Sequence, residues 1–246
     1  MCKDFSVLYE DADLAVVRKS AGLPSQADAS RDPDLLSLLA ERYRRRGESA
    51  RVFPVHRLDR GVGGLMVVAR SENAAAALSA ALSDHRSFVK EYLAVFHGYA
   101  GVACDVMTNM LYRDERARKT LLVSEDDPRG KRAVLSYAVQ NELRENGKKP
   151  LSLALIRLGT GRTHQIRAQF SGHGHPLAGD RRYGARDRYG EISLFSARLS
   201  FLHPRTLERM TFCSLPDRIS GFAEFSFDET IFERSLPDFA ELPSGV

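Results

Sequence analysis

Three residues of this chain carry side chains that could do chemistry in surroundings that look partly apolar. Asp59 lies between two arginines in VHRLDRGVGG, Arg167 ends the segment THQIR, and Tyr92 follows Lys90 on one face of FVKEYLAVFHG. A carboxylate that stays ionised in a partly dry pocket needs a cationic partner, because desolvation alone raises its pKa. With an aromatic ring beside them, such a pair would suit a flat, hydrogen-bonding ligand such as a nucleobase.

Each of the three also has a simpler explanation. Asp59 could form a surface ion pair, Arg167 could be a solvated helix residue, and Tyr92 could be a core residue. The spacing of the residues leaves both interpretations open.

Other kinds of nucleotide and metal site fit the chain less well. The run GVGG (61–64) lacks the Lys-Ser/Thr of a P-loop and leads into a strand, so we interpret its glycines as turn and packing residues. His164, His173 and His175 have neither the helical spacing nor the cysteine partners that zinc sites use. We therefore expect no metal site.

A cysteine or serine nucleophile is not expected either. No elbow motif is present, and Cys104 and Cys213 lie in strand-like segments where a buried structural role is usual. With Cys2 they make an odd and widely spaced set, which argues against a disulfide framework and predicts a reduced, cytoplasmic protein.

The composition fits a soluble chain with a sizeable core. Of 246 residues, 43% are hydrophobic, and no apolar run reaches the roughly 18 residues that a membrane span needs. Arginine gathers in four clusters, at 41–51, 113–119, 129–132 and 179–190, while the tail from Glu224 onward is acidic. Arginine clusters suit a phosphate backbone, although solvated loops would explain them equally well.

The elements that must position these residues are mostly short strands. Alternating or continuous apolar runs predict strands at 6–9, 14–18, 64–70, 88–98, 133–139, 151–158, 192–195, 197–201 and 209–213. Strands that follow one another without a helical crossover indicate an α+β fold with a mixed, mainly antiparallel sheet flanked by helices. No linker divides the chain, so we expect a single domain over 1–246, with an acidic tail at about 224–246.

Three helices have predicted ends. Asp32 is placed to cap the first, with Pro33 at its first position and Gly47 at its end. Ser71 is placed to cap an alanine-rich second helix, and Thr163 a short third one.

The order of these motifs resembles the RluA family of pseudouridine synthases over about residues 6–216. HRLDRGVGGLMVVAR resembles the family's first motif, VKEYLAVFHG its Lys-x-Tyr strand, and LGTGRTHQIRAQFSGHGHPLAGDRRYG a third segment. The resemblance implies that a uridine in RNA is isomerised to its C-glycoside without a metal or an organic cofactor. It implies that Asp59 is the catalytic carboxylate, that Tyr92 lies against the base, and that Arg167 pairs with Asp59.

The target base must leave its stack to be reached, so an arginine-rich rim is expected around the site. We expect Arg57 and Arg60 to contribute to that rim, and Lys90, Arg162 and His164 to contact RNA as well. For Arg57 and Arg60 the alternative is a solvated pair.

The chain departs from the family pattern at two places. Val62-Gly63 replaces a frequent Thr-Ser, and Phe195 stands where many members carry histidine. The family pattern begins within about six residues of Met1, so the frequent N-terminal S4-type domain is not expected and RNA must bind the catalytic domain itself.

The expected substrate is ribosomal or transfer RNA, and the expected protein is a monomer. Two other activities stay open: a catalytically silent RNA-binding module, and a hydrolase that uses Asp59 on another glycosidic bond. The second would normally need another carboxylate nearby.

Overall fold

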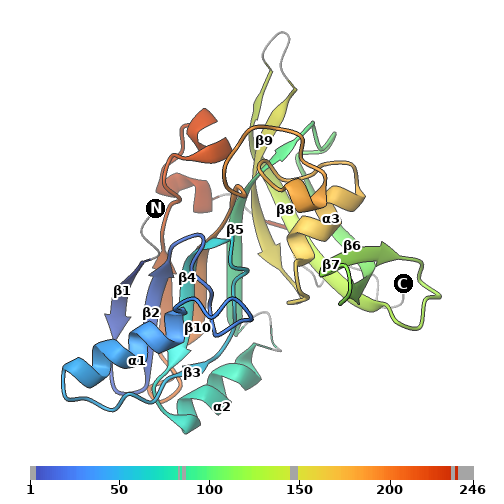
Figure 1. Ribbon diagram of the computed structural model, residues 1–246. Helices are drawn as coiled ribbons and strands as arrows, with labels where there is room; N and C mark the ends of the chain where they lie inside the picture. The colour runs from blue at the N-terminus through green and yellow to red at the C-terminus, as the bar shows by residue number, and fades with distance from the viewer. Residues whose placement is uncertain (1–3, 83, 85–86, 145–148, 234–235, 238–246) are drawn as a thin grey trace. The chain divides into compact units, whose positions relative to one another are not determined.

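The computed structural model describes residues 4–82, 84, 87–144, 149–233 and 236–237, and it confirms the predicted α+β class (Figure 1). The chain forms two compact units. Unit 1 comprises Met1–Lys90 and Phe195–Leu215, and unit 2 comprises Glu91–Leu194 and Pro216–Val246. Cys2 and residues 238–246 of the predicted acidic tail lie outside the described residues. The single domain expected from the sequence stays a prediction.

Unit 1 is built on a mixed sheet. Its strands lie in the order β1-β2-β4-β10, with β3 beside β4 and β11 beside β10. The β4–β10 pair is parallel and the others are antiparallel, as the sequence predicted for a mixed, mainly antiparallel sheet. The elements are β1 Phe5–Glu10, β2 Leu14–Lys19, α1 Leu35–Arg45, β3 Phe53–Pro54, β4 Gly63–Ala69, α2 Glu72–Ala81, β10 Leu194–Leu202 and β11 Arg209–Cys213.

The first helix begins two residues later than predicted, so the proposed cap at Asp32 is wrong. Asp34 is the N-cap, and its Oδ1 accepts hydrogen bonds from the backbone N–H groups of Leu36 and Ser37. Asp32 instead pairs with the guanidinium of Arg60. Both aspartates are chemically suited to cap a helix, but Asp32 is engaged in the ion pair with Arg60 and Asp34 is the cap.

The other predicted helix ends of unit 1 are confirmed. Gly47 follows α1 with φ +72, the left-handed conformation that commonly ends a helix. Ser71 caps α2 by accepting a hydrogen bond from the N–H of Ala74.

The core of unit 1 lies between α2 and the sheet, since α2 contacts β4 and β3. Every residue of β4 is buried, which its continuous apolar run predicted. The cluster brings together Leu14, Val16, Leu65, Val67, Ala74, Leu78, Phe88, Leu199 and Phe201. It gives the turn before β4, which carries Asp59, a rigid support.

Unit 2 is built on an antiparallel sheet in the order β5-β9-β8-β6-β7. Its helix α3 lies against β6 and β7 (Figure 1). The elements are β5 Phe88–His97, β6 Cys104–Asp114, β7 Lys119–Val123, β8 Lys131–Leu143, β9 Leu151–Leu158 and α3 Gln165–Gly172, followed by the 3-10 turns Arg181–Tyr183, Ser220–Glu224 and Glu229–Phe232. The first three residues of β5 belong to unit 1.

The third helix also begins later than predicted, and Thr163 is not its cap. His164 occupies the N-cap position in the left-handed conformation, with φ +54, and makes no side-chain cap bond. Gln165, the first residue of the helix, instead stabilises the turn before it, because its Oε1 accepts a hydrogen bond from the N–H of Arg162 while its own N–H donates to the Arg162 carbonyl. The sharp turn therefore replaces the expected hydroxyl cap.

The two described cysteines correct a further expectation. Cys104 begins β6 and Cys213 ends β11, so both are in strands as predicted, but both are exposed rather than buried. Strand ends project beyond the packed part of a sheet, where a thiol meets solvent.

Candidate active site

Asp59 lies in a tight turn between β3 and β4 in unit 1. The N–H of Val62 donates to the carbonyl of Asp59 at 3.0 Å and closes the turn. The residue before it, Leu58, is held by Ser25, whose Oγ donates to the Leu58 carbonyl at 2.8 Å and accepts from the Leu58 N–H at 3.1 Å. The backbone on both sides of the carboxylate is therefore fixed, while Asp59 itself is only partly buried.

A fully buried lysine supports the same turn from β2. The Nζ of Lys19 donates to the carbonyls of Leu23 at 2.8 Å, Ser20 at 3.1 Å, and Asp59 and Arg60 at 3.5 Å each. Burial lowers the pKa of Lys19 to about 7, and the Asp59 carboxylate opposes that shift. Lys19 was not among the predicted site residues, although a lysine at the end of the segment LAVVRK was a visible signal.

Arg60 has several partners within unit 1. Its Nε donates to the carbonyl of Gly22 at 3.1 Å and its Nη1 to the Oγ of Ser30 at 2.9 Å, and the guanidinium pairs with Asp32 and lies 3.7 Å from Asp28. Arg60 therefore braces the turn, and contact with RNA stays a prediction for it.

Arg57 is exposed, as a rim residue would be. Its contact with RNA likewise stays a prediction.

His56 and Lys90 interact electrostatically within unit 1. His56 Nε2 accepts a hydrogen bond from the N–H of Val67 at 3.1 Å, and its ring meets the edge of Phe88. Burial, and then the Lys90 ammonium, lower the pKa of His56 to about 3, so the imidazole is neutral. Lys90 is itself buried, and burial lowers its pKa. The RNA contact expected for Lys90 stays a prediction.

Tyr92 lies in β5 within unit 2, opposite Ile156 of β9, and is 6% exposed. The neighbouring pair in the register is Glu91 and Arg157, and both Nε and Nη2 of Arg157 donate to one oxygen of the buried Glu91 at 2.9 and 2.7 Å. This cross-strand ion pair locks the register that positions Tyr92.

Arg167 forms a buried bidentate ion pair with Asp180 in unit 2. Its Nε lies 2.6 Å from Oδ2 and its Nη2 lies 2.9 Å from Oδ1, and the carboxylate side chain is 1% exposed. Such a planar pair fixes the orientation of the guanidinium. Asp180 was not among the predicted site residues, although it stands in the quoted segment PLAGDRRYG.

Tyr183 connects this pair to β7 and to the start of α3. The Arg167 guanidinium lies 4.9 Å from the Tyr183 ring centroid. The Tyr183 hydroxyl accepts from the N–H of Thr120 at 2.8 Å and lies 2.9 Å from His164 Nδ1. Burial is the main reason that the pKa of Tyr183 is raised. His164 is therefore tied to the Arg167 network, and its predicted contact with RNA stays a prediction.

Arg162 is exposed, and its Nε donates to the carbonyl of Arg132 at 3.0 Å. The predicted pairing of Arg167 with Asp59 would join unit 2 to unit 1 and also stays a prediction. Within its own unit, each catalytic candidate lies on a backbone that buried polar contacts hold in place.

A comparison with protein families identifies the chain. Residues 13–172 match the family model described as RNA pseudouridylate synthase. The chain belongs to this family. The resemblance in sequence is thereby confirmed, and the protein is an isomerase that acts on uridine in RNA.

Curated pseudouridine synthases are similar over most of the chain. The ribosomal large subunit pseudouridine synthase D of Zymomonas mobilis is 34% identical over 221 residues, which cover 84% of this chain and 67% of that protein. The protein of the same name in Vibrio parahaemolyticus is 33% identical, with 94% and 73% covered. The uncharacterized RNA pseudouridine synthase YhcT of Bacillus subtilis is 31% identical, with 83% and 66% covered. The chain thus spans about two thirds to three quarters of these relatives.

Solved structures of pseudouridylate synthases share the fold. Human RNA pseudouridylate synthase domain containing 1 superposes with a TM-score of 0.70 at 25% identity, covering 87% of this chain and 84% of that one. Human RNA pseudouridylate synthase domain containing 4 gives a TM-score of 0.68 at 21% identity, covering 86% and 88%. The α+β fold of this pseudouridine synthase is therefore that of the family.

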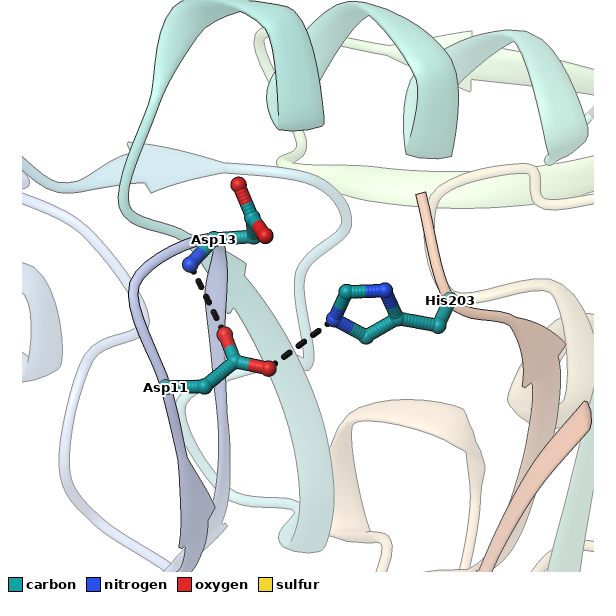
Figure 2. Close-up of side chains that lie close together, drawn as sticks. All are labelled: Asp11, Asp13 and His203. Atoms are coloured by element: carbon teal, nitrogen blue, oxygen red, sulfur yellow. Dashed lines mark hydrogen bonds and ion pairs between the residues drawn. The ribbon is translucent and has the colours of Figure 1, made fainter. Parts of the chain in front are cut away.

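Among the described residues, one group has the ligand types of a metal site, namely Asp11, Asp13 and His203 (Figure 2). Its donor atoms already have partners. Asp11 accepts from the Tyr9 hydroxyl, the Asp13 N–H and His203 Nε2, and Asp13 pairs with Arg205. We interpret the group as a set of structural contacts that hold the β1–β2 turn against the loop after β10. No described helix of the synthase has the length and apolar character of a membrane span.

Proposed function

We propose that this pseudouridine synthase modifies a uridine of large-subunit ribosomal RNA, with Asp59 as its catalytic carboxylate. The name shared by its Zymomonas and Vibrio relatives supports the ribosomal target. The observation that carries the assignment of Asp59 is its turn. The N–H of Val62 closes the turn, the Lys19 ammonium contacts the Asp59 carbonyl, and Asp59 is left partly exposed.

The reaction rearranges bonds without a change in composition. The bond between N1 of uracil and C1′ of ribose breaks, the uracil turns, and a bond forms between C5 and C1′. The proton that C5 loses is balanced by the proton that N1 gains, so no oxidant or reductant is needed. Asp59 acts either as a nucleophile at C1′ or as a base at C2′, and both routes need the ionised carboxylate.

Arg167 is proposed to keep that carboxylate ionised. Its ion pair with Asp180 uses the Nε–Nη2 edge of the guanidinium. The Nη1 group is the donor that we propose for Asp59, because a nearby cation lowers the pKa of a carboxyl group.

Tyr92 is proposed to lie against the target base. Its place in the register, fixed by the neighbouring Glu91–Arg157 pair, supports a constant position for the ring. A phenol held this way can stack on the uracil and assist proton transfer.

The test uses chemical mapping of pseudouridine. Large-subunit ribosomal RNA and total transfer RNA are incubated with the wild type, Asp59→Ala, and the control Asp126→Asn, which changes an exposed carboxylate in another loop. We expect a new site in ribosomal RNA with the wild type and the control, and none with Asp59→Ala. Sites made equally by Asp59→Ala would exclude Asp59 as catalyst.

The remaining outcomes separate the alternatives. A site confined to transfer RNA would replace the proposed substrate, release of free uracil would indicate a hydrolase, and RNA binding with no product would indicate a silent module.

A further inference from the structure

Unit 2 contains a large cavity whose lining includes neither of its candidate catalytic residues, Tyr92 and Arg167. The cavity has a volume of about 1430 Å³ and is lined by the ends of β5, β8 and β9 and by the loop 184–189. His97 of β5 is part of its wall and lies five positions beyond Tyr92, which corresponds to roughly 16 Å along a strand. In Figure 1 the loop belongs to the orange segment that follows α3.

A largely buried aspartate, Asp187, makes hydrogen bonds within this loop and to the residues beside it. Oδ2 of Asp187 accepts a hydrogen bond from the Gly179 N–H at 2.9 Å and lies 2.6 Å from His97 Nε2, while Oδ1 accepts from the Tyr189 N–H at 3.1 Å. Burial alone would raise the pKa of Asp187, but these hydrogen bonds hold it below its usual value. Asp187 is therefore ionised and its charge is directed into the wall.

The residues on either side of Asp187 point the other way. Arg186 and Arg188 are both exposed, whereas Asp187 between them is largely covered. Across the cavity Lys149 is exposed as well. Within the described ranges, none of these three cations has an ion-pair partner.

The second carboxylate of the lining is also engaged, because Glu224 accepts a hydrogen bond from the Tyr189 hydroxyl at 3.0 Å. The cavity thus presents three cations, while both of its carboxylates already have hydrogen-bond donors. The ligand that matches this lining is an anion.

The size and chemistry of the cavity favour a polymer over a small anion. Pockets for small molecules usually have about 300–1,000 Å³, and this one is larger. Guanidinium groups match the paired oxygens of a phosphate, and a phosphate chain offers such groups at regular intervals. The family of this chain acts on RNA, which makes a nucleic-acid backbone the anion that the protein must meet.

We propose that the groove formed by Lys149, Arg186, Arg188 and Tyr189 is a second RNA-contact site, which binds the phosphate backbone of substrate RNA outside the target nucleotide. The inference rests on the proposed function, since it extends the RNA footprint of the same enzyme. It would give the enzyme affinity for RNA in addition to its contacts with the target nucleotide.

The test compares two pairs of arginines. Arg186→Ala/Arg188→Ala removes the unpaired charges of the groove. Arg205→Ala/Arg209→Ala is the matched control, because Arg205 already pairs with Asp13 and Arg209 donates to Ser200. All four side chains belong to exposed residues, so we expect both variants to fold, and thermal melting checks this.

Binding is measured by fluorescence anisotropy with a labelled oligouridylate of about 20 nucleotides, titrated from about 50 to 200 mM KCl. We expect the groove variant to bind about tenfold more weakly at low salt. Its plot of log affinity against log salt should be shallower by about 1.4, since each phosphate contact of a single strand contributes about 0.7. The control variant should stay within about twofold of wild type at every salt concentration.

If the groove variant bound RNA with the same affinity and the same salt dependence as the wild type, the inference would be overturned, whether or not pseudouridine is formed. The inference would also be overturned if the groove variant lost affinity for poly-L-glutamate but not for the oligouridylate. That result would indicate an acidic protein partner. If the wild type forms no pseudouridine but the groove variant still loses RNA binding, the proposed function fails and the RNA groove stands.

Discussion

Gly64 of β4 lies against the backbone of Ser196 in β10 so closely that a Cβ atom at Gly64 would overlap the Ser196 carbonyl and amide. Gly64 also has φ +119, a conformation that other residues rarely adopt. The parallel pairing of β4 with β10 thus depends on a glycine five residues after Asp59. This relationship explains the glycine-rich run after the catalytic candidate as a packing requirement.

Gly64→Ala should therefore reduce stability severely. We expect a loss of about 3 kcal/mol or more in the free energy of unfolding, because overlap and backbone strain act together. Gly190→Ala is the control, since a Cβ there meets nothing within 4 Å. Urea unfolding followed by circular dichroism measures both, and equal midpoints for the two variants would contradict the close approach.

The neighbouring glycine relates the two departures from the family pattern. Gly63 is the register partner of Phe195, and a Cβ at Gly63 would lie 3.4 Å from Cδ2 of the phenylalanine ring and 3.3 Å from the Lys19 carbonyl. The Arg18 guanidinium lies 5.5 Å from the centroid of the same ring. Gly63 and the ring of Phe195 therefore lie in direct contact within unit 1, so the two departures belong to one local packing arrangement.

Much of this fold could be predicted from periodicity. The strands with strong apolar patterns, such as β4 and β5, appear where they were expected. The helix starts were less accurate, because Asp32 and Asp34 are equally good caps by type and a distant arginine decides between them. Strands β6 and β7 were not predicted, since partial exposure leaves them without a clear apolar pattern.

The candidate site was predicted in part for a similar reason. Asp59, Tyr92 and Arg167 belong to recognisable motifs, whereas Asp180 and Lys19 owe their importance to contacts between distant segments. Asp180 meets Arg167 across a turn, and Lys19 meets the Asp59 turn 40 residues away. Local sequence patterns do not predict such contacts.

The ion pair of Arg167 with Asp180 should be essential for both folding and catalysis. Asp180→Ala leaves a buried guanidinium without its bidentate partner, and removing one partner of a buried pair typically costs about 3–5 kcal/mol. Asp127→Ala is the control, because Asp127 pairs with the exposed Arg129, and loss of a solvent-exposed ion pair has a much smaller effect on stability. Chemical unfolding measures both effects.

Asp180→Asn tests the catalytic part of the same role. The amide keeps the size of the side chain and can still accept a hydrogen bond, but it no longer holds the guanidinium by charge. We expect kcat for pseudouridine formation to fall by about tenfold or more, with a smaller change in KM, because the loss acts on orientation. A purely structural role would lower the amount of folded enzyme and leave the kcat of the folded fraction unchanged.

Lys19 should make stability depend on pH in the alkaline range. Its pKa is about 7 in the folded protein and 10.5 in its ordinary state, so between these values the unfolded chain binds more protons than the folded one. The free energy of unfolding contributed by Lys19 therefore rises from about pH 7 to pH 10.5 and is constant below pH 7, where both states are protonated. Lys19→Met removes this titration. The difference in unfolding free energy between wild type and variant, measured by urea unfolding at several pH values, should thus shift in favour of wild type by a few kcal/mol at most as the pH is raised.

Loss of the four Lys19–carbonyl contacts should also loosen the Asp59 turn, and we expect faster hydrogen exchange at the Val62 amide that closes it. A pH-independent difference in stability, together with unchanged exchange at Val62, would show that the ammonium neither titrates in this range nor supports the turn.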